Sequence, residues 1–152
     1  MAEQKKIRVR PHIDRKPVAS DITAAEISQL VDRFYDEIRK DARLGPIFEA
    51  RVQGNWDPHL AKMKKFWRSV LLKTSEYYGA PMPVHMSIEG VQSDDFGHWL
   101  DLFRPVARDV FSSEAAPVVI ATAERIARSL WMGRFATLEN SHPSWAAQPG
   151  DD

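Results

Sequence analysis

The chain has 152 residues and a mass of 17.3 kDa, and 43% of its residues are hydrophobic. This length and apolar content predict one globular domain with its own core and exclude a disordered chain. Cysteine is absent, which excludes disulfides, thiolate zinc sites, iron–sulfur clusters and cysteine nucleophiles. The 21 basic and 21 acidic residues cancel, so the overall charge gives no reason to expect a nucleic-acid partner.

The charge is unevenly spread along the chain. Residues 1–20 carry a net charge of +4, whereas residues 139–152 carry −3 and are rich in turn formers. No apolar run approaches the roughly 20 residues that span a bilayer, and the first residues contain no apolar signal core. We expect a cytoplasmic protein without membrane association. We divide it into a basic N-terminal extension (1–20), a central domain (21–137) and a flexible C-terminal tail (138–152).

The first predicted helix begins after a capping box formed by Thr23 and Glu26, with Ile22 and Ile27 placed to form a hydrophobic staple. Apolar side chains then recur with helical spacing at Ile27, Leu30, Val31, Phe34, Tyr35 and Ile38. The LGPIF stretch at 44–48 is expected to break this helix. Asp57 and Pro58 are expected to provide a cap and a first-turn proline for a second helix, whose apolar stripe is His59, Met63, Phe66 and Val70.

Residues 77–83, with the sequence YYGAPMP, cannot form a regular helix, and His85 follows them directly. A third helix is expected to open at 93–95, with acidic residues in its first turn and a kink at Pro105. The last long helix is expected to start at Pro117 and to end near Gly133. We therefore predict an all-α fold of four longer helices with an irregular connection that carries His85.

Five histidines are candidates for chemistry. His12 and His142 lie in the predicted tails, and His98 falls off the apolar stripe of its helix, so we expect these three at the surface. His59 lies on an apolar helix stripe, and His85 lies in a proline-braced apolar segment. Either one, taken alone, is more often a hydrogen-bonded core histidine than a ligand. No H-x-x-x-H motif or carboxylate cluster predicts zinc. A lone histidine in an apolar pocket suits the axial ligand of a haem iron, held without covalent attachment.

Tyr35 and Trp99 each place a polar tip on an apolar helix face, so each needs a partner if it is buried. A backbone carbonyl is the commonest partner, and a ligand in a pocket is the other interpretation. The motifs for a nucleophile elbow, a P-loop and a dinucleotide turn are absent from the sequence. Neither residue is therefore assigned to a hydrolase or nucleotide site.

Across residues 22–135 these weak signals occur together in a familiar order: Phe34-Tyr35, Pro46-Ile47-Phe48, Asp57-Pro58-His59, Pro83-Val84-His85 and His98-Trp99-Leu100. This set resembles the truncated haemoglobins, whose fold is a two-over-two helical sandwich. The glycine pairs of the family's first group are missing. A tryptophan like Trp99 also occurs in the second group, whereas the pairing of Tyr35 with His59 favours the third.

The resemblance implies one haem b per chain, with His85 as the iron ligand and Phe48 packed flat on the porphyrin. Tyr35, His59 and Trp99 would bind the gaseous ligand on the opposite, distal face. Further haem contacts are implied for Phe34, Met63, Phe66, Trp67, Met82 and Phe96. Lys62, Lys65 and Arg68 lie on the outer side of the second helix, where a solvated face is the commoner role and a haem propionate is the other.

The same resemblance implies binding of dioxygen, nitric oxide or carbon monoxide, and dioxygen transport is a family role. Two distal donors would slow dioxygen release, which favours nitric-oxide dioxygenation or peroxidase-like chemistry over storage. Such a cycle would need an external reductant, and we expect a monomer or weak dimer. The alternative is a cofactor-free helical interaction or sensor domain that keeps the same skeleton, although buried polar groups would be costly there.

Overall fold

A computed structural model describes residues 21–74, 89–137, 143 and 145. Within these residues the chain is helical and contains no strand, which confirms the predicted all-α class. The helices are α1 (Ala24–Lys40), α2 (Leu44–Val52), α3 (Trp56–Leu72), α5 (Asp95–Val110) and α6 (Ala115–Phe135). His85 and Met82 lie outside the described residues.

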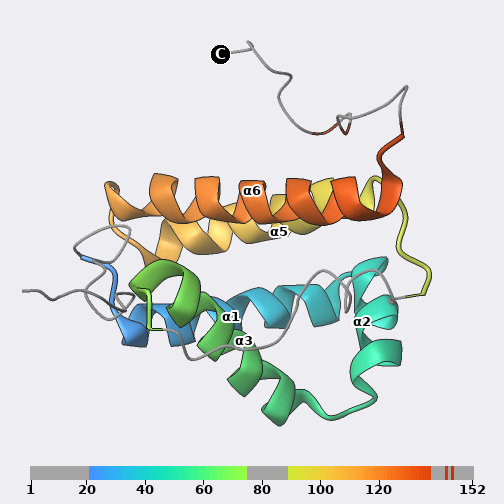
Figure 1. Cartoon of the computed structure of the whole chain (residues 1–152). Helices are drawn as coiled ribbons and strands as arrows, with labels where there is room; N and C mark the ends of the chain where they lie inside the picture. The colour runs from blue at the N-terminus through green and yellow to red at the C-terminus, as the bar shows by residue number, and fades with distance from the viewer. Residues whose placement is uncertain (1–20, 75–88, 138–142, 144, 146–152) are drawn as a thin grey trace, which may run out of the picture.

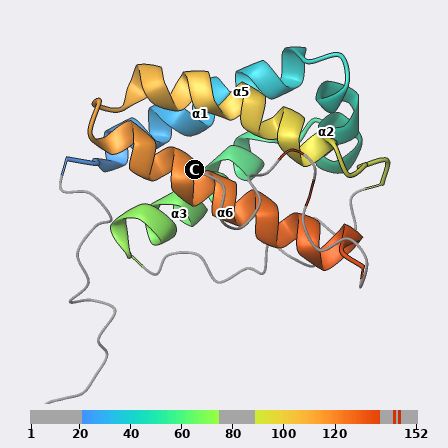
Figure 2. The same cartoon turned by 90° about the horizontal axis from the view of Figure 1, so that it is seen from above.

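The long helices form two layers (Figure 1). Helices α5 and α6 pack against each other in one layer, and α1 and α3 pack against each other in the second layer. Helix α1 also packs against α5, which joins the layers, and the short α2 lies at one end between α1 and α3. The view from above shows α3 beneath α6 (Figure 2). This arrangement confirms the predicted two-over-two sandwich.

The start of α1 has the predicted capping box. The N–H of Glu26 donates to Oγ1 of Thr23 at 3.2 Å, and the N–H of Thr23 donates to Oε1 of Glu26 at 3.1 Å. Both bonds satisfy backbone donors that have no partner inside the helix. Ile22 and Ile27 are both buried, as expected for a staple. The apolar stripe of α1 is likewise buried, and it presents Tyr35 to the interior.

Helix α1 ends at Lys40, so the predicted break before residues 44–48 is confirmed, but Leu44–Val52 is itself a helix of nine residues that the sequence did not predict. Pro46 lies in its first turn, where a backbone N–H has no helical acceptor, so the proline costs no hydrogen bond. A Cβ on Gly45 would lie 2.8 Å from the carbonyl oxygen of Arg39, which is too close for any other residue. Glycine therefore lets α2 begin directly against the end of α1.

Helix α3 begins one residue before the predicted cap. Its first residue is Trp56, so Asp57 is a first-turn residue and not the cap, and Asn55 at the cap position makes no side-chain capping bond. The carboxylate of Asp57 still lies near the positive end of the helix dipole. The most buried side chains of α3 are Trp56, Trp67 and Leu71, whereas His59 on the predicted stripe is only half-buried.

Helix α5 begins within the predicted 93–95 opening, whereas α6 begins earlier and ends later than predicted. Helix α5 runs from Asp95 through Pro105 to Val110 without ending at the proline. Helix α6 begins at Ala115, two residues before Pro117. Gly133 does not end α6, because the helix continues to Phe135. In the described residues, no helix is long and apolar enough to cross a membrane.

Two residues of the predicted C-terminal tail pack against the domain. Pro143 is fully buried, and Trp145 packs so closely on Gly97 that a Cβ there would lie 2.7 Å from its side chain. The indole N–H of Trp145 donates to the carbonyl oxygen of Ser93 at 3.1 Å. The packed surface of the domain therefore extends to these two positions.

Candidate functional site

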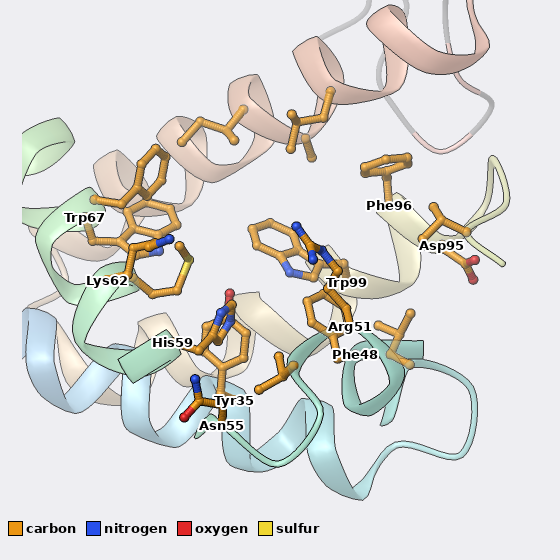
Figure 3. Close-up of a pocket in the computed structure, with 18 of the residues that line it drawn as sticks. Tyr35, Phe48, Arg51, Asn55, His59, Lys62, Trp67, Asp95, Phe96 and Trp99 are labelled. Atoms are coloured by element: carbon orange, nitrogen blue, oxygen red, sulfur yellow. The ribbon is translucent and has the colours of Figure 1, made fainter. Parts of the chain in front are cut away.

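A cavity of about 370 Å³ lies between the two layers (Figure 3). All five described helices contribute to its wall, together with Val91 in the segment before α5. Its volume falls within the roughly 300–1,000 Å³ of small-molecule and cofactor sites. The helical residues of the wall are Tyr35, Leu44, Phe48, Arg51, Val52, Pro58, His59, Lys62, Met63, Phe66, Trp67, Asp95, Phe96, Trp99, Ile126, Ala127 and Leu130.

The structure brings most of the sequence-predicted site residues to this one cavity. The lining residues among them are Tyr35, Phe48, His59, Met63, Phe66, Trp67, Phe96 and Trp99. Phe34 lies behind the wall: its ring is 1% exposed and packs edge-on against the rings of Tyr35 and Trp99, at centroid distances of 5.2 and 5.0 Å. Met82 and His85 lie outside the described residues, and the roles of all these residues stay predictions.

Tyr35 and His59 meet at the base of the cavity. Their rings are 5.2 Å apart and nearly perpendicular, at an angle of 88°. Tyr35 is 5% exposed, and this burial raises the pKa of its hydroxyl well above the ordinary value. The hydroxyl therefore stays protonated at physiological pH and can donate a hydrogen bond. The Nε2 atom of His59 is shielded from solvent although the residue as a whole is half-buried.

Trp99 extends from α5 toward the same space (Figure 3). Its indole stacks on Phe103 with a centroid distance of 5.4 Å and an angle of 16° between the rings. The edge contact with Phe34, at 5.0 Å and 87°, holds its other side. These contacts fix the orientation of an indole N–H that can only donate.

The Tyr35 hydroxyl and the Trp99 indole N–H have no hydrogen-bond partner among the described residues. Other indoles of the chain are bonded: Trp56 donates to Glu49 at 2.9 Å, and Trp131 donates to Ser93 Oγ at 2.7 Å. The backbone carbonyl that is the commonest partner is therefore not found for Tyr35 or Trp99 in the described part of the chain. Both residues line the cavity, so these two donors suit a bound ligand that accepts hydrogen bonds.

The cavity also has polar residues that the sequence did not assign to it. Arg51, Asn55 and Lys62 lie on its wall, and Lys62 was expected on a solvated face. Together Arg51 and Lys62 bring two positive charges to an otherwise largely apolar site. The sequence did not indicate that these residues line a cavity. Arg51 lies in α2, a helix that the sequence did not predict, and a lysine such as Lys62 on a helix is usually solvated. The α6 residues of the wall belong to a predicted inward stripe, but only tertiary packing shows which cavity they face.

A buried carboxylate, Asp95, fixes the segment that leads into α5. The guanidinium of Arg43 donates two hydrogen bonds to it, at 3.0 and 2.7 Å, and the N–H of Gln92 donates a third at 2.7 Å. Arg43 also donates to the carbonyl oxygen of Gly90 at 2.7 Å. Burial alone would raise the pKa of Asp95, but the bonds from Arg43 and Gln92 outweigh it and hold this pKa below the ordinary value.

The ion pair of Asp95 should make stability depend on acid pH. A carboxylate whose pKa is lowered by folding stabilises the fold above its unfolded pKa of about 4, and that contribution is lost as the pH falls through the folded pKa. We expect Asp95→Asn to be less stable than the wild type at pH 7 and the difference to shrink toward pH 3. Urea unfolding at several pH values measures this, with the exposed Asp101→Asn as a matched control. A difference that is equal at all pH values would contradict the prediction.

His98 lies outside the cavity wall. Its side chain is 39% exposed, and its Nε2 lies 2.7 Å from Oδ1 of Asp41. The other oxygen of Asp41 accepts from the N–H groups of Arg43 and Leu44 at the start of α2. His98 is therefore a half-exposed residue that links α5 to the α1–α2 turn, and its partly solvated position agrees with the sequence prediction.

The fold and cavity define a small helical protein built to enclose a largely apolar group beside two hydrogen-bond donors. No family model matches the chain. A group 3 truncated hemoglobin from Campylobacter jejuni is 33% identical over 109 residues, which are 70% of this chain and 86% of that protein. A crystal structure of a group III truncated hemoglobin from Campylobacter jejuni matches with a TM-score of 0.71 and 31% identity, over 74% of this chain and 91% of that one.

The chain belongs to the group 3 truncated haemoglobins. Membership of this family implies a globin-type haem cofactor and small gaseous ligands. The resemblance found in the sequence is thereby confirmed, both for the family and for its group. The cavity fits such a cofactor, because an apolar wall is combined with two cations and with donors that lack a described protein partner.

Proposed function

We propose that the chain holds one non-covalent haem b in the cavity, with His85 as its iron ligand, and binds dioxygen or another diatomic gas beside Tyr35, His59 and Trp99. The observation that carries this proposal is the pair of donors, Tyr35 and Trp99, that line one apolar cavity without a hydrogen-bond partner in the described chain. The family supports the cofactor, and the lone histidine in the proline-braced segment 81–88 supports the ligand.

Each part of the cavity wall has a distinct task in this proposal. Apolar side chains that line the cavity from α2, α3, α5 and α6, Phe48 among them, would exclude water and pack against the porphyrin. The cations of Arg51 and Lys62 suit the two propionates, since Arg and Lys pair with carboxylates by charge-assisted hydrogen bonds. The wall residues that provide the apolar contact are Phe48, Met63, Phe66, Trp67, Phe96, Ile126, Ala127 and Leu130.

Haem, when bound, supplies an iron atom that takes a diatomic gas and gives dioxygen a partial negative charge. Tyr35 and Trp99 donate hydrogen bonds to a ligand of that kind, and the raised pKa of Tyr35 means that its hydroxyl keeps its proton while doing so. A hydrogen bond to a charged acceptor is worth about 1.5–3 kcal/mol. Two such bonds retain dioxygen longer than a storage protein requires, which supports nitric-oxide or reactive-oxygen chemistry with an external reductant.

The cofactor part of the proposal is tested by adding haem to the haem-free full chain. We expect saturation at one haem per chain with a Soret band, and reversible binding of dioxygen and carbon monoxide by the reduced protein. A colourless chain that takes up no haem would instead support the cofactor-free interaction domain. Stopped-flow mixing of the oxygenated protein with nitric oxide then tests the chemistry, because rapid loss of the oxygenated spectrum with stoichiometric nitrate is expected.

A further inference from the structure

Trp56, the first residue of α3, is held by charged side chains from two other helices. Its indole N–H donates to Oε1 of Glu49 in α2 at 2.9 Å. The guanidinium carbon of Arg39 in α1 lies 4.6 Å from the centroid of its ring system. Trp56 is 5% exposed. One bond therefore fixes the edge of the indole and one cation–π contact fixes its face, so the ring cannot turn without losing one of them.

The same indole contacts both polar residues at the base of the cavity. Its ring is 5.7 Å from the ring of His59 at an angle of 88°, and 6.2 Å from the ring of Tyr35 at 55°. His59 and Tyr35 also contact each other edge-on. Trp56 itself does not belong to the lining residues of the cavity. It lies behind the two residues that do.

We propose that Trp56 is a positioning residue that holds the His59 ring against Tyr35 and so keeps the imidazole in the cavity wall. Trp56 and His59 are three residues apart, which places them on the same face of α3. A perpendicular ring contact sets an orientation as well as a distance, because the positive edge of one ring meets the negative face of the other. If His59 swung away from the cavity, it would lose its contacts with Trp56 and Tyr35 together.

This inference rests on the proposed haem site only for its functional consequence. The anchors of Trp56 go beyond what core filling requires, since an apolar ring of the same size would fill the space without Glu49 or Arg39. Glu49 is exposed and lies next to Phe48 in α2, so its bond to Trp56 ties the orientation of the indole to a second wall of the cavity. The proposal therefore predicts that a substitution which removes a contact of Trp56 alters the position of the His59 ring while the fold stays intact.

The test compares Trp56→Phe and Glu49→Leu with Trp131→Phe. Trp131 is a matched control, because it also loses a buried indole bond, to Ser93, but it has no ring contact with Tyr35 or His59. Nuclear Overhauser cross-peaks between the His59 and Tyr35 rings are measured in the full chain, with and without haem. We expect them to weaken in both test variants and to persist in the control. Unchanged cross-peaks in both test variants would overturn the proposal.

The functional consequence is measured in the carbon monoxide complex. We expect Trp56→Phe and Glu49→Leu to broaden or split the infrared C–O stretching band and to change carbon monoxide association by severalfold. In a His59→Leu background the same substitutions should have no such effect. If the substitutions had effects of equal size in the His59→Leu background, Trp56 would influence the gas through general packing and not through His59, which would contradict the proposed positioning role. If the chain takes up no haem, the proposed function fails while the cross-peaks still decide the position of His59.

Discussion

Replacing His85 with alanine is expected to abolish stable haem binding. The segment 81–88 combines two prolines, apolar residues and this one histidine, and the chain contains no cysteine that could replace it as a ligand. In the proposed site an iron–imidazole bond from His85 would be the coordinate bond between the cofactor and this segment, since the porphyrin supplies four other ligands to the iron. The measurement is the Soret absorbance per chain after purification and after haem titration, where we expect at most a small residual fraction.

Two controls separate loss of a ligand from loss of the fold. His59→Leu removes the histidine that lines the cavity and should retain a full haem complement. His85→Gly leaves space at the ligand position, and imidazole added to the buffer should restore part of the Soret band. A His85→Ala protein that purifies with a full haem complement and unchanged reduced spectra would show that the ligand assignment is wrong.

The sequence predicted the helical class well because apolar residues recur with helical spacing, whereas it placed helix starts poorly wherever a proline was involved. Pro46, Pro58 and Pro117 each occupy the third position of their helix. Proline is commonest at the first position, so the predicted starts fell too late or were missed. Proline is nevertheless tolerated at any position of the first turn, because none of the first four N–H groups has a helical acceptor that proline would leave unpaired.

The cavity illustrates a different limit. Tyr35, His59 and Trp99 could be singled out from the sequence because polar groups on apolar stripes require partners. Arg51, Lys62 and Asp95 could not, since a charged residue on a helix is usually solvated and only the packing of α2, α3 and α5 brings these three to one wall. The contacts that hold Trp56 could not be predicted from the sequence either. They join a glutamate of α2 and an arginine of α1 to the first residue of α3, and only the tertiary fold brings these side chains together.

The ring contacts around the cavity hold the two proposed donors in place, so they would act on a bound gas with little loss of entropy. Trp99 is stacked on Phe103, and Tyr35 makes edge contacts with Phe34 and Phe48, so neither side chain has to be ordered when a ligand enters. Hydrogen-bond donors that are fixed before binding give more of their interaction energy to the ligand. The substitution of either donor should therefore be felt mainly in the rate at which the ligand leaves.

Tyr35→Phe is expected to speed dioxygen release by roughly ten- to a hundred-fold, which corresponds to the loss of about 1.5–3 kcal/mol from one charge-assisted hydrogen bond. The change removes only the hydroxyl, which is protonated at physiological pH and whose pKa burial raises still further. Trp99→Phe should change the rate in the same direction. Stopped-flow displacement of dioxygen measures both variants against the wild type.

Carbon monoxide provides the internal control for this prediction, because it is a poorer hydrogen-bond acceptor than dioxygen. A packing defect at Tyr35, which contacts Phe34, Phe48, Trp56 and His59, would disturb the release of both gases alike. Loss of a hydrogen bond should instead leave carbon monoxide release nearly unchanged. Equal shifts for the two gases, or no shift for dioxygen, would mean that Tyr35 fills the core and does not donate to the ligand.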